Sequence, residues 1–235
     1  YTSSHTIYVD LLNQLKEWID QSPTSRFVDI VVFNYDNLIE KAMENVYNYD
    51  WHSKNKQAPM GAYYSGKNLR IYKPHGSINW GREVMRKDSH FEYKLIQEAF
   101  HEFNQIELAH SFQFIDPDII ATDQPKNVVP AIAVPFKKKT NFEECPQEMQ
   151  VEMLNAINNA NKIITFGWKG ADENFTNLLT TNTKIDEVYL ISPRAVSNLK
   201  KIFPAEKLRP FETTFSYFVS ETPTLEGLLA GFEHS

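Results

Sequence analysis

The sequence predicts an α/β fold in which a parallel sheet carries helices on both of its faces. Short apolar segments rich in Val, Ile, Tyr and Phe recur along the chain and are typical of buried strands. Longer segments between them repeat apolar residues every three or four positions, which indicates one buried face of a helix. Strands that alternate with helices in this way favour parallel strands joined by crossover helices.

Length, charge and composition narrow the class of protein. The chain has 235 residues, 42% of them hydrophobic, so it can bury one sizeable core, and we expect a single domain over residues 1–235. The net charge of −6 argues against a nucleic-acid partner, which requires a basic stripe, and the short basic run at 137–139 is expected to be solvated surface. No segment reaches the length of a membrane-spanning helix, and we expect no membrane partner.

Cys145 is the single cysteine of the sequence. One cysteine excludes an intrachain disulfide framework and any cysteine-rich zinc site, so we expect no bound metal. It is also consistent with a reducing compartment, and together with the missing signal peptide it predicts a cytoplasmic protein.

The first third of the chain is predicted to alternate helix and strand. Ser22-Pro23 closes the first helix and Pro74 ends the second strand. Residues 48–67 are aromatic and polar without a period, and predict a long loop whose rings either cover a substrate or form a small satellite cluster. The predicted elements are a helix at 8–19, a strand at 29–33, a helix at 38–46 and a strand at 69–72.

Beyond Trp80 the sequence predicts a charged, mostly helical insertion over residues 81–125, because Ile96, Phe100 and Phe103 fall on one helical face. The alternation of strand and helix then resumes. The predicted elements are strands at 128–136, 162–166, 187–191 and 214–219, and helices at 149–160, from Asp172 onward, at 196–203 and at 225–232.

Polar residues follow two of the predicted strands directly. Asn34 and Asp36 come after the first strand, and His75, followed by a glycine, comes after the second. The carboxyl ends of parallel strands meet at one edge of a sheet, where ligands gather. A second interpretation stays open, because Asn37 with Glu40 has the spacing of a capping box and His75 could be a turn residue.

A third polar turn lies between a predicted strand and a helix. Gly167 and Gly170 enclose Trp168 and Lys169, and glycines in such a turn let backbone N–H groups approach a phosphate or a ribose. The alternative is a tight turn without a ligand.

Four segments, "VVFNYDNLIE", "YKPHGSINW", "IITFGWKGADENF" and "VYLISPRA", stand in the order of the motifs of SIR2-like (sirtuin-like) NAD-binding domains, over residues 27–195. The sequence therefore resembles that family, which implies a Rossmann-like fold and NAD+ as the bound molecule. Ser192 stands where the family has an asparagine, and a hydroxyl cannot make an amide's pair of hydrogen bonds. The residues that the resemblance assigns to NAD+ are Asp36, Gly76, Ser77, Gly167, Trp168, Lys169 and Ser192.

The resemblance also implies an NAD+ glycohydrolase that releases nicotinamide and ADP-ribose, with Asn34 and His75 as the catalytic pair. An amide can orient a water molecule or a ribose hydroxyl without adding charge, and an imidazole can accept a proton near neutral pH. Asp36 would stabilise the positive charge that develops as the bond to nicotinamide breaks.

Two departures from the family shape the expected function. The helical insertion stands where the deacylases carry a four-cysteine zinc module, so the sequence resembles the zinc-free NADases of bacterial antiphage defence. Those proteins suggest a homo-oligomer and a sensor domain or partner protein. An NAD-dependent protein deacylase and a non-catalytic nucleotide-binding or assembly module are the alternatives.

The second departure is at the front of the chain. The family begins with a strand and a glycine-rich phosphate loop, and nothing before the helix at 8–19 matches them. We expect the chain to be a fragment of a longer protein in which this loop lies upstream of Tyr1.

Overall fold

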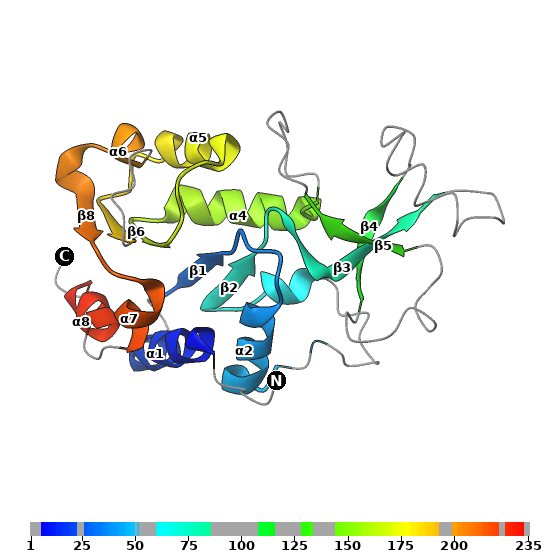
Figure 1. Ribbon diagram of the computed structural model, residues 1–235, viewed down its shortest axis with the longest axis horizontal. Helices are drawn as coiled ribbons and strands as arrows, with labels where there is room; N and C mark the ends of the chain where they lie inside the picture. The colour runs from blue at the N-terminus through cyan, green and yellow to red at the C-terminus, as the bar shows by residue number, and fades with distance from the viewer. Residues whose placement is uncertain are drawn as a thin grey trace.

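The computed structural model describes most of the chain, and its ribbon is drawn in Figure 1. Two parallel sheets lie beside each other, helices flank them, and a third sheet is antiparallel. No described helix is both long enough and apolar enough to cross a membrane. The described residues are 6–22, 26–49, 51, 60–85, 108–115, 128–133, 144–192, 199–220 and 224–232.

The first parallel sheet pairs β1 (Val28–Val31) with β2 (Leu69–Tyr72) in register, so that Val31 lies opposite Tyr72. Its helices are α1 (Ile7–Gln21), which precedes β1, and α2 (Leu38–Tyr47), which follows it. The apolar face predicted for the first helix is confirmed, because Leu11, Leu12, Leu15 and Ile19 are buried.

The second parallel sheet has the order β6-β7-β8. The strands predicted at 162–166 and 187–191 are confirmed as β6 and β7. Together with the first sheet and its helices, this arrangement confirms the predicted α/β fold. The elements are β6 (Lys162–Phe166), β7 (Glu187–Ile191), β8 (Leu208–Phe211), α4 (Gln147–Asn159), α5 (Glu173–Thr181), α6 (Leu199–Ile202), a 3-10 helix (Ala205–Lys207), α7 (Phe215–Ser220) and α8 (Thr224–Gly231).

The third sheet places strands at both described ends of the segment predicted as a helical insertion, whereas Ile96, Phe100 and Phe103, which predicted the helix, lie outside the described residues. β3 (Gly76–Val84) lies between β4 (Leu108–Phe114) and β5 (Val128–Ile132), and both pairings are antiparallel. The described parts of the 81–125 segment are thus strands, while residues 86–107 and 116–125 lie outside the described residues. Residues 76–84 form a strand rather than a helix because β3 buries Trp80 and Val84 and pairs with a strand on each of its edges.

The C-terminal part corrects one prediction. Residues 215–219 of the strand expected at 214–219 belong to α7 instead, because a helix places Phe218 and Val219 together against α1. Their aromatic and β-branched side chains had favoured a strand. The predicted last helix is confirmed as α8, and β8 is a strand that the sequence did not predict.

Two aromatic residues of the segment predicted as a long loop are part of the core. Trp51 and Tyr63 are buried, and their rings lie 4.5 Å apart. Tyr63 belongs to a 3-10 helix (Met60–Tyr63) and meets Trp80 edge to face. These two residues form a core cluster rather than a cover over a substrate, whereas residues 52–59 lie outside the described part.

Candidate functional site

The site is built where β1 and β2 end. Because these strands are parallel neighbours, the segments that leave them, residues 33–37 and 73–77, emerge at the same edge of the sheet. The prediction of two neighbouring strand tips is confirmed, since the rings of Phe33 and His75 lie 5.3 Å apart. Gly76 adopts a φ of +81°, which turns the chain away from β2 directly after His75.

His75 forms a hydrogen bond to a carboxylate across the two sheets. Its Nε2 lies 2.6 Å from Oδ2 of Asp172, and the two side chains are 26% and 14% exposed. Asp172 also caps α5, because its Oδ1 accepts a hydrogen bond of 2.9 Å from the N–H of Phe175. A carboxylate that is fixed by a helix cap therefore orients the imidazole.

The bonds to Asp172 favour its charged form. Burial by itself raises the pKa of the Asp172 carboxyl, but the hydrogen bonds from His75 and from the backbone of Phe175 and Asn174 outweigh it. The pKa is held below its usual range. Asp172 is consequently an anion at neutral pH, placed to stabilise a protonated His75.

Aromatic rings enclose the pair on one side. Phe33 stacks on Trp168 with ring centroids 5.5 Å apart and an interplanar angle of 3°. Phe175 meets both of these rings edge to face. The rings bring the turn after β6 next to the tip of β1 and exclude water from that side of His75.

Asn34 lies in the segment after β1, and its side chain is in contact with α1. Its side chain is exposed and interacts with the hydroxyl of Tyr8 at the start of α1. The rings beside His75 belong to Phe33 and Tyr35, which flank Asn34 in the chain. Within the described residues no hydrogen bond joins Asn34 to His75, so its catalytic role remains a prediction.

The capping box expected at the start of α2 is wrong. The side chain of Asn37 makes no capping bond. The N–H of Leu38 instead donates to Oδ1 of Asp36 at 3.2 Å. The side chain of Glu40 points into the core and pairs with the ammonium group of Lys73. A full positive charge stabilises the carboxylate more than the backbone N–H of a helix cap would.

Lys73 and Glu40 form a buried ion pair behind the site. Lys73 Nζ lies 2.9 Å from Glu40 Oε1, with side-chain exposures of 0% and 3%. Lys73 also donates to the carbonyl of Asp36 and to Oγ of Ser77. Burial lowers the pKa of Lys73, and the carboxylate of Glu40 opposes that effect. The pair therefore ties the segments after β1 and β2 to each other from inside.

The other predicted contacts with NAD+ fall into two groups. Ser77 is fully buried and bonded to Lys73, so its side chain faces the interior. Gly167 has a φ of +64°, and a side chain at this position would point into open space. Lys169, two residues later, is exposed. Ser192 follows β7, the strand that pairs with β6. The structure thus brings residues 33–37, 73–77 and 167–172 together. Ser192 lies near Gly167, because the N–H of Gly167 donates to the carbonyl of Ile191, the residue before Ser192.

Asp172 is the site residue that the sequence did not reveal. It was predicted only as the start of a helix, and 97 positions separate it from His75. The signal available was its place at a helix start directly after a glycine turn, which is where a carboxylate can both cap and face a sheet edge.

No group of three or more His, Cys, Asp or Glu side chains suited to a metal ion occurs among the described residues. Cys145 is buried, and burial raises the pKa of its thiol to about 12. A thiol of that kind stays protonated at neutral pH and is a poor metal ligand.

Solved structures share this fold at low sequence identity. A Sir2 bound to a p53 peptide and NAD+ is 12% identical, with a TM-score of 0.50 over 95% of this chain and 70% of that one. Sir2Tm bound to a propionylated peptide is 13% identical, with a TM-score of 0.50 over 95% and 71%. A mutant Sir2 homologue complexed with 2'-O-acetyl ADP ribose is 11% identical, with a TM-score of 0.52 over 97% and 66%.

No curated protein matches the sequence. The SIR2-like domain family matches residues 29–211, which include both strand tips, the His75–Asp172 pair and the glycine turn. The chain therefore belongs to the SIR2-like domain family, as the order of its four motifs predicted.

Proposed function

We propose that this domain is an NAD+ glycohydrolase, which cleaves the bond between nicotinamide and ribose and releases nicotinamide and ADP-ribose. The observation that carries the proposal is the His75–Asp172 pair at the carboxyl edge of a SIR2-like fold. The family uses NAD+, and two of the similar Sir2 structures were solved with NAD+ or 2'-O-acetyl ADP ribose.

The proton chemistry follows from which ring nitrogen is engaged. With Nε2 of His75 donating to Asp172, Nδ1 is the nitrogen that accepts a proton from water or from a ribose hydroxyl. The imidazolium that forms is stabilised by the Asp172 anion 2.6 Å away. The rings of Phe33 and Trp168 limit the access of bulk water, which favours attack by a single positioned water molecule.

The remaining roles concern the substrate. Asn34, exposed at the same strand edge, would orient the attacking water or a ribose hydroxyl, and Asp36 would stabilise positive charge on the sugar. The open space at Gly167 lets a phosphate or ribose approach its backbone, with Trp168, Lys169, Gly76 and Ser192 around it. Ser77 would act from the interior, through Lys73 and the segment that carries His75.

Nicotinamide release tests the proposal directly. The full-length protein is incubated with NAD+ in the presence and absence of an acylated peptide, and nicotinamide is quantified. We expect release without peptide, and its loss in Asn34→Ala and His75→Ala variants that keep the circular dichroism spectrum of the parent. Release only with peptide would identify a deacylase instead, and unchanged turnover in either variant would exclude the assigned mechanism.

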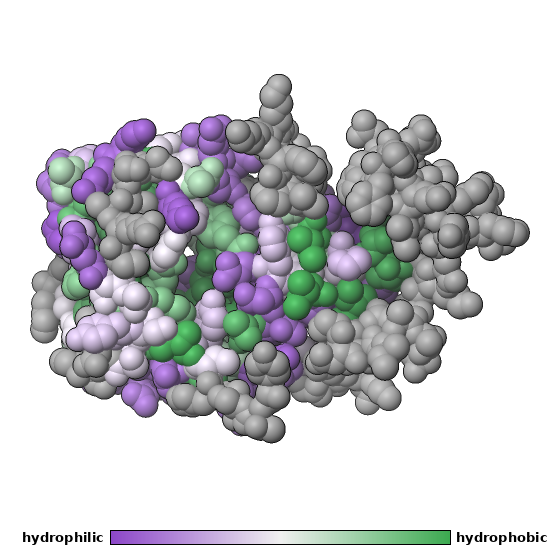
Figure 2. All heavy atoms as spheres, in the orientation of Figure 1, coloured by the Kyte–Doolittle hydropathy of each residue, from purple (hydrophilic) through white to green (hydrophobic). Residues whose placement is uncertain are grey.

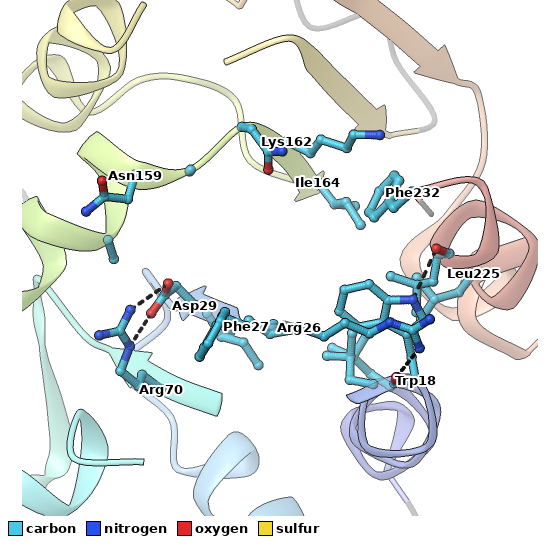
Figure 3. A pocket seen from close by; sticks show the side chains of 18 of the residues that line it. Trp18, Arg26, Phe27, Asp29, Arg70, Asn159, Lys162, Ile164, Leu225 and Phe232 are labelled. Carbon is cyan, nitrogen blue, oxygen red and sulfur yellow. Dashed lines mark hydrogen bonds and ion pairs between the residues drawn. The ribbon is translucent and has the colours of Figure 1, made fainter. Parts of the chain in front are cut away.

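A second candidate is a nucleotide-binding or assembly module without catalysis. It is favoured by one observation: a cavity of about 850 Å³ between β1 and β6 (Figure 3) is lined by neither Asn34 nor His75. Calorimetric titration with NAD+ separates the two functions, since a binding module gives a heat of binding without nicotinamide in the product mixture.

The cellular role is a further part of the proposal. Because a single cysteine rules out a four-cysteine zinc module within these 235 residues, we propose a cytoplasmic effector of bacterial antiphage defence, acting as a homo-oligomer with a sensor domain or partner protein. Expression in a phage-challenged bacterium should lower cellular NAD+ with the parent protein and leave it unchanged with His75→Ala.

A further inference from the structure

Tyr35 lies where the antiparallel sheet meets the tips of β1 and β2. It stands in the segment after β1, and its ring centroid is 6.3 Å from that of His75. Figure 1 shows the antiparallel sheet to one side of the parallel sheets, with β3 following the tip of β2. In the same view, Figure 2 shows green apolar residues where Figure 1 draws β3 and β5, and hydrophilic residues beside them. The tips of β1 and β2 thus lie at the junction of the two kinds of sheet.

The backbone of Tyr35 is fixed by a bulge in β3. The register between β3 and β5 shifts between Ser77 and Gly81, so residues 78–80 bulge out of that pairing. The N–H of Ile78, within the bulge, donates to the carbonyl of Tyr35 at 2.8 Å. The hydroxyl of Ser77 donates to the same carbonyl at 3.3 Å. The bulge therefore holds the segment after β1 as a strand partner would.

The side chain of Tyr35 is fixed at its other end, beside β5. Ala133, the residue after β5, continues the ladder opposite His75, and its N–H donates to the carbonyl of His75 at 2.8 Å. Opposite residues of such an antiparallel pair exchange two bonds, so a continued ladder would place a backbone donor at the carbonyl of Ala133. That carbonyl accepts from the hydroxyl of Tyr35 at 2.6 Å. A side chain from the tip of β1 thus binds where the ladder would place a backbone N–H.

These bonds form a closed ring around His75. Tyr35 binds Ala133, Ala133 binds His75, and the bulge that follows His75 binds Tyr35. The hydroxyl of Tyr35 is the side-chain member of this ring, and the other bonds join backbone groups. Burial raises the pKa of Tyr35, so the phenol keeps its proton at neutral pH and donates it. One oxygen atom therefore connects the end of β5 to the tip of β1 across the backbone that carries the imidazole.

The position of the imidazole depends on that backbone. The ring of Phe33 lies 5.3 Å from it on the side of β1, and its Nε2 lies 2.6 Å from Oδ2 of Asp172 on α5. Asp172 is fixed by its helix cap, so a displaced His75 backbone would lengthen the bond between the two side chains. Small displacements of a reacting group lower the rate of catalysis strongly.

We propose that Tyr35 is a positioning residue, whose hydroxyl holds the backbone of His75 so that its imidazole presents Nε2 to Asp172 and Nδ1 to the substrate. The proposal rests on the proposed function in one respect, because it takes His75 as the proton acceptor of NAD+ cleavage. The proton of the hydroxyl is already used by Ala133, so Tyr35 acts through His75 and not on the substrate.

Removal of one oxygen atom tests the proposal. Tyr35→Phe keeps the ring beside His75 and should lower kcat for nicotinamide release about tenfold, while KM stays within about twofold of the parent. The matched control is Tyr72→Phe, which loses the bond of a buried tyrosine to Asp29 on the neighbouring strand. This substitution lies outside the ring of hydrogen bonds and should keep kcat within about twofold of the parent.

A second measurement does not depend on turnover. Nitrogen NMR of the neutral imidazole reports which ring nitrogen carries the proton, and the signals of His75 are those that vanish in His75→Ala. We expect the Nε2–H tautomer in the parent and in Tyr72→Phe, and a mixture of both tautomers in Tyr35→Phe. A general loss of stability would leave the tautomer of the folded protein unchanged.

The tautomer is decisive, because an unchanged tautomer in Tyr35→Phe would overturn the proposal. A rise in KM without a fall in kcat would overturn it too, since Tyr35 would then contact the substrate. Equal losses of kcat in both tyrosine variants would point to destabilisation instead, and a Tyr35→Phe protein that does not fold would make the hydroxyl part of the fold. If the parent releases no nicotinamide, the proposed function fails, and the tautomers alone decide whether Tyr35 positions His75.

Discussion

Two side-chain pairs begin in the same short segment after β2, and they differ in their exposure to solvent. Lys73 points inward to Glu40, and both side chains are buried; His75, two residues later, points to Asp172, and both remain partly exposed. The inner pair joins two backbone segments and offers nothing to a ligand, whereas the outer pair leaves one ring nitrogen available. Lys73, which stabilises the site from inside, and His75, which can react, are therefore only two positions apart.

The largest expected effect comes from the outer pair. His75→Ala should lower nicotinamide release by about 10²–10⁴-fold, because it removes the proton acceptor. The fold should persist, since Asp172 still caps α5. The matched control is His110→Ala, an exposed histidine on β4, which should keep full activity. Equal losses in both variants would show that His75 has no special role.

The inner pair should act on stability. Lys73→Ala leaves the Glu40 carboxylate buried without its cation and should lower the free energy of unfolding by about 3–5 kcal/mol in urea denaturation. Lys16→Ala breaks an exposed pair with Asp20 on α1 and should cost at most about 1 kcal/mol.

A double variant sharpens this result. Lys73→Met combined with Glu40→Met removes both charges and should recover most of the lost stability, because no unpaired charge remains. A double variant as unstable as Lys73→Ala would mean that the bonds from Lys73 to Asp36 and Ser77, rather than the charge pair, stabilise the turn.

A smaller effect is expected from the carboxylate that orients His75. Asp172→Asn keeps a side chain that can cap α5 but replaces the anion, so we expect kcat to fall by about 10–100-fold while KM changes little. A variant whose kcat equals that of the parent would assign Asp172 a purely structural role.

The same variant has a defined effect on acid stability. The folded-state pKa of Asp172 is lowered, so its contribution is present above the unfolded value of about 3.9 and is lost as the pH falls through the folded value. Asp172→Asn should therefore unfold with a weaker pH dependence below about pH 4. Urea denaturation at a series of pH values measures this difference.

The smallest effect concerns the ring that shields the outer pair. Trp168→Leu keeps an apolar side chain but loses the stacking on Phe33, and should lower the free energy of unfolding by about 0.5–1.5 kcal/mol. If Trp168 also contacts NAD+, KM should rise in steady-state assays. An unchanged KM would limit the residue to packing.

The sequence predicted those elements whose local pattern and tertiary role agree. The strands at 69–72, 162–166 and 187–191 are apolar runs bounded by Gly, Pro or polar residues, and each lies in a parallel sheet. β8 could not be predicted because it contains Pro210. An edge strand tolerates a proline, but in a sequence a proline argues against a strand. α7 has the composition of a strand, and only its packing on α1 makes it a helix.

The same distinction applies to the site: its locally encoded parts could be predicted, and its long-range contacts could not. The tips of β1 and β2 follow from two local runs and the rule for parallel strands, so their proximity could be predicted. The partner of His75 could not, because a contact across 97 positions depends on how the two sheets meet. Glu40 was misread as a cap because its spacing from Asn37 is local, whereas its partner Lys73 is 33 positions away.

The glycine after His75 has a consequence for how related sequences are interpreted. A Cβ at position 76 would lie 2.0 Å from the carbonyl oxygen of Ala131, so any larger residue would push β5 away from β3. The glycine is therefore demanded by architecture alone, whatever the histidine does. A relative that has lost its chemistry would still need that glycine, and only the imidazole, together with a carboxylate at the head of α5, should be taken as a mark of an active enzyme.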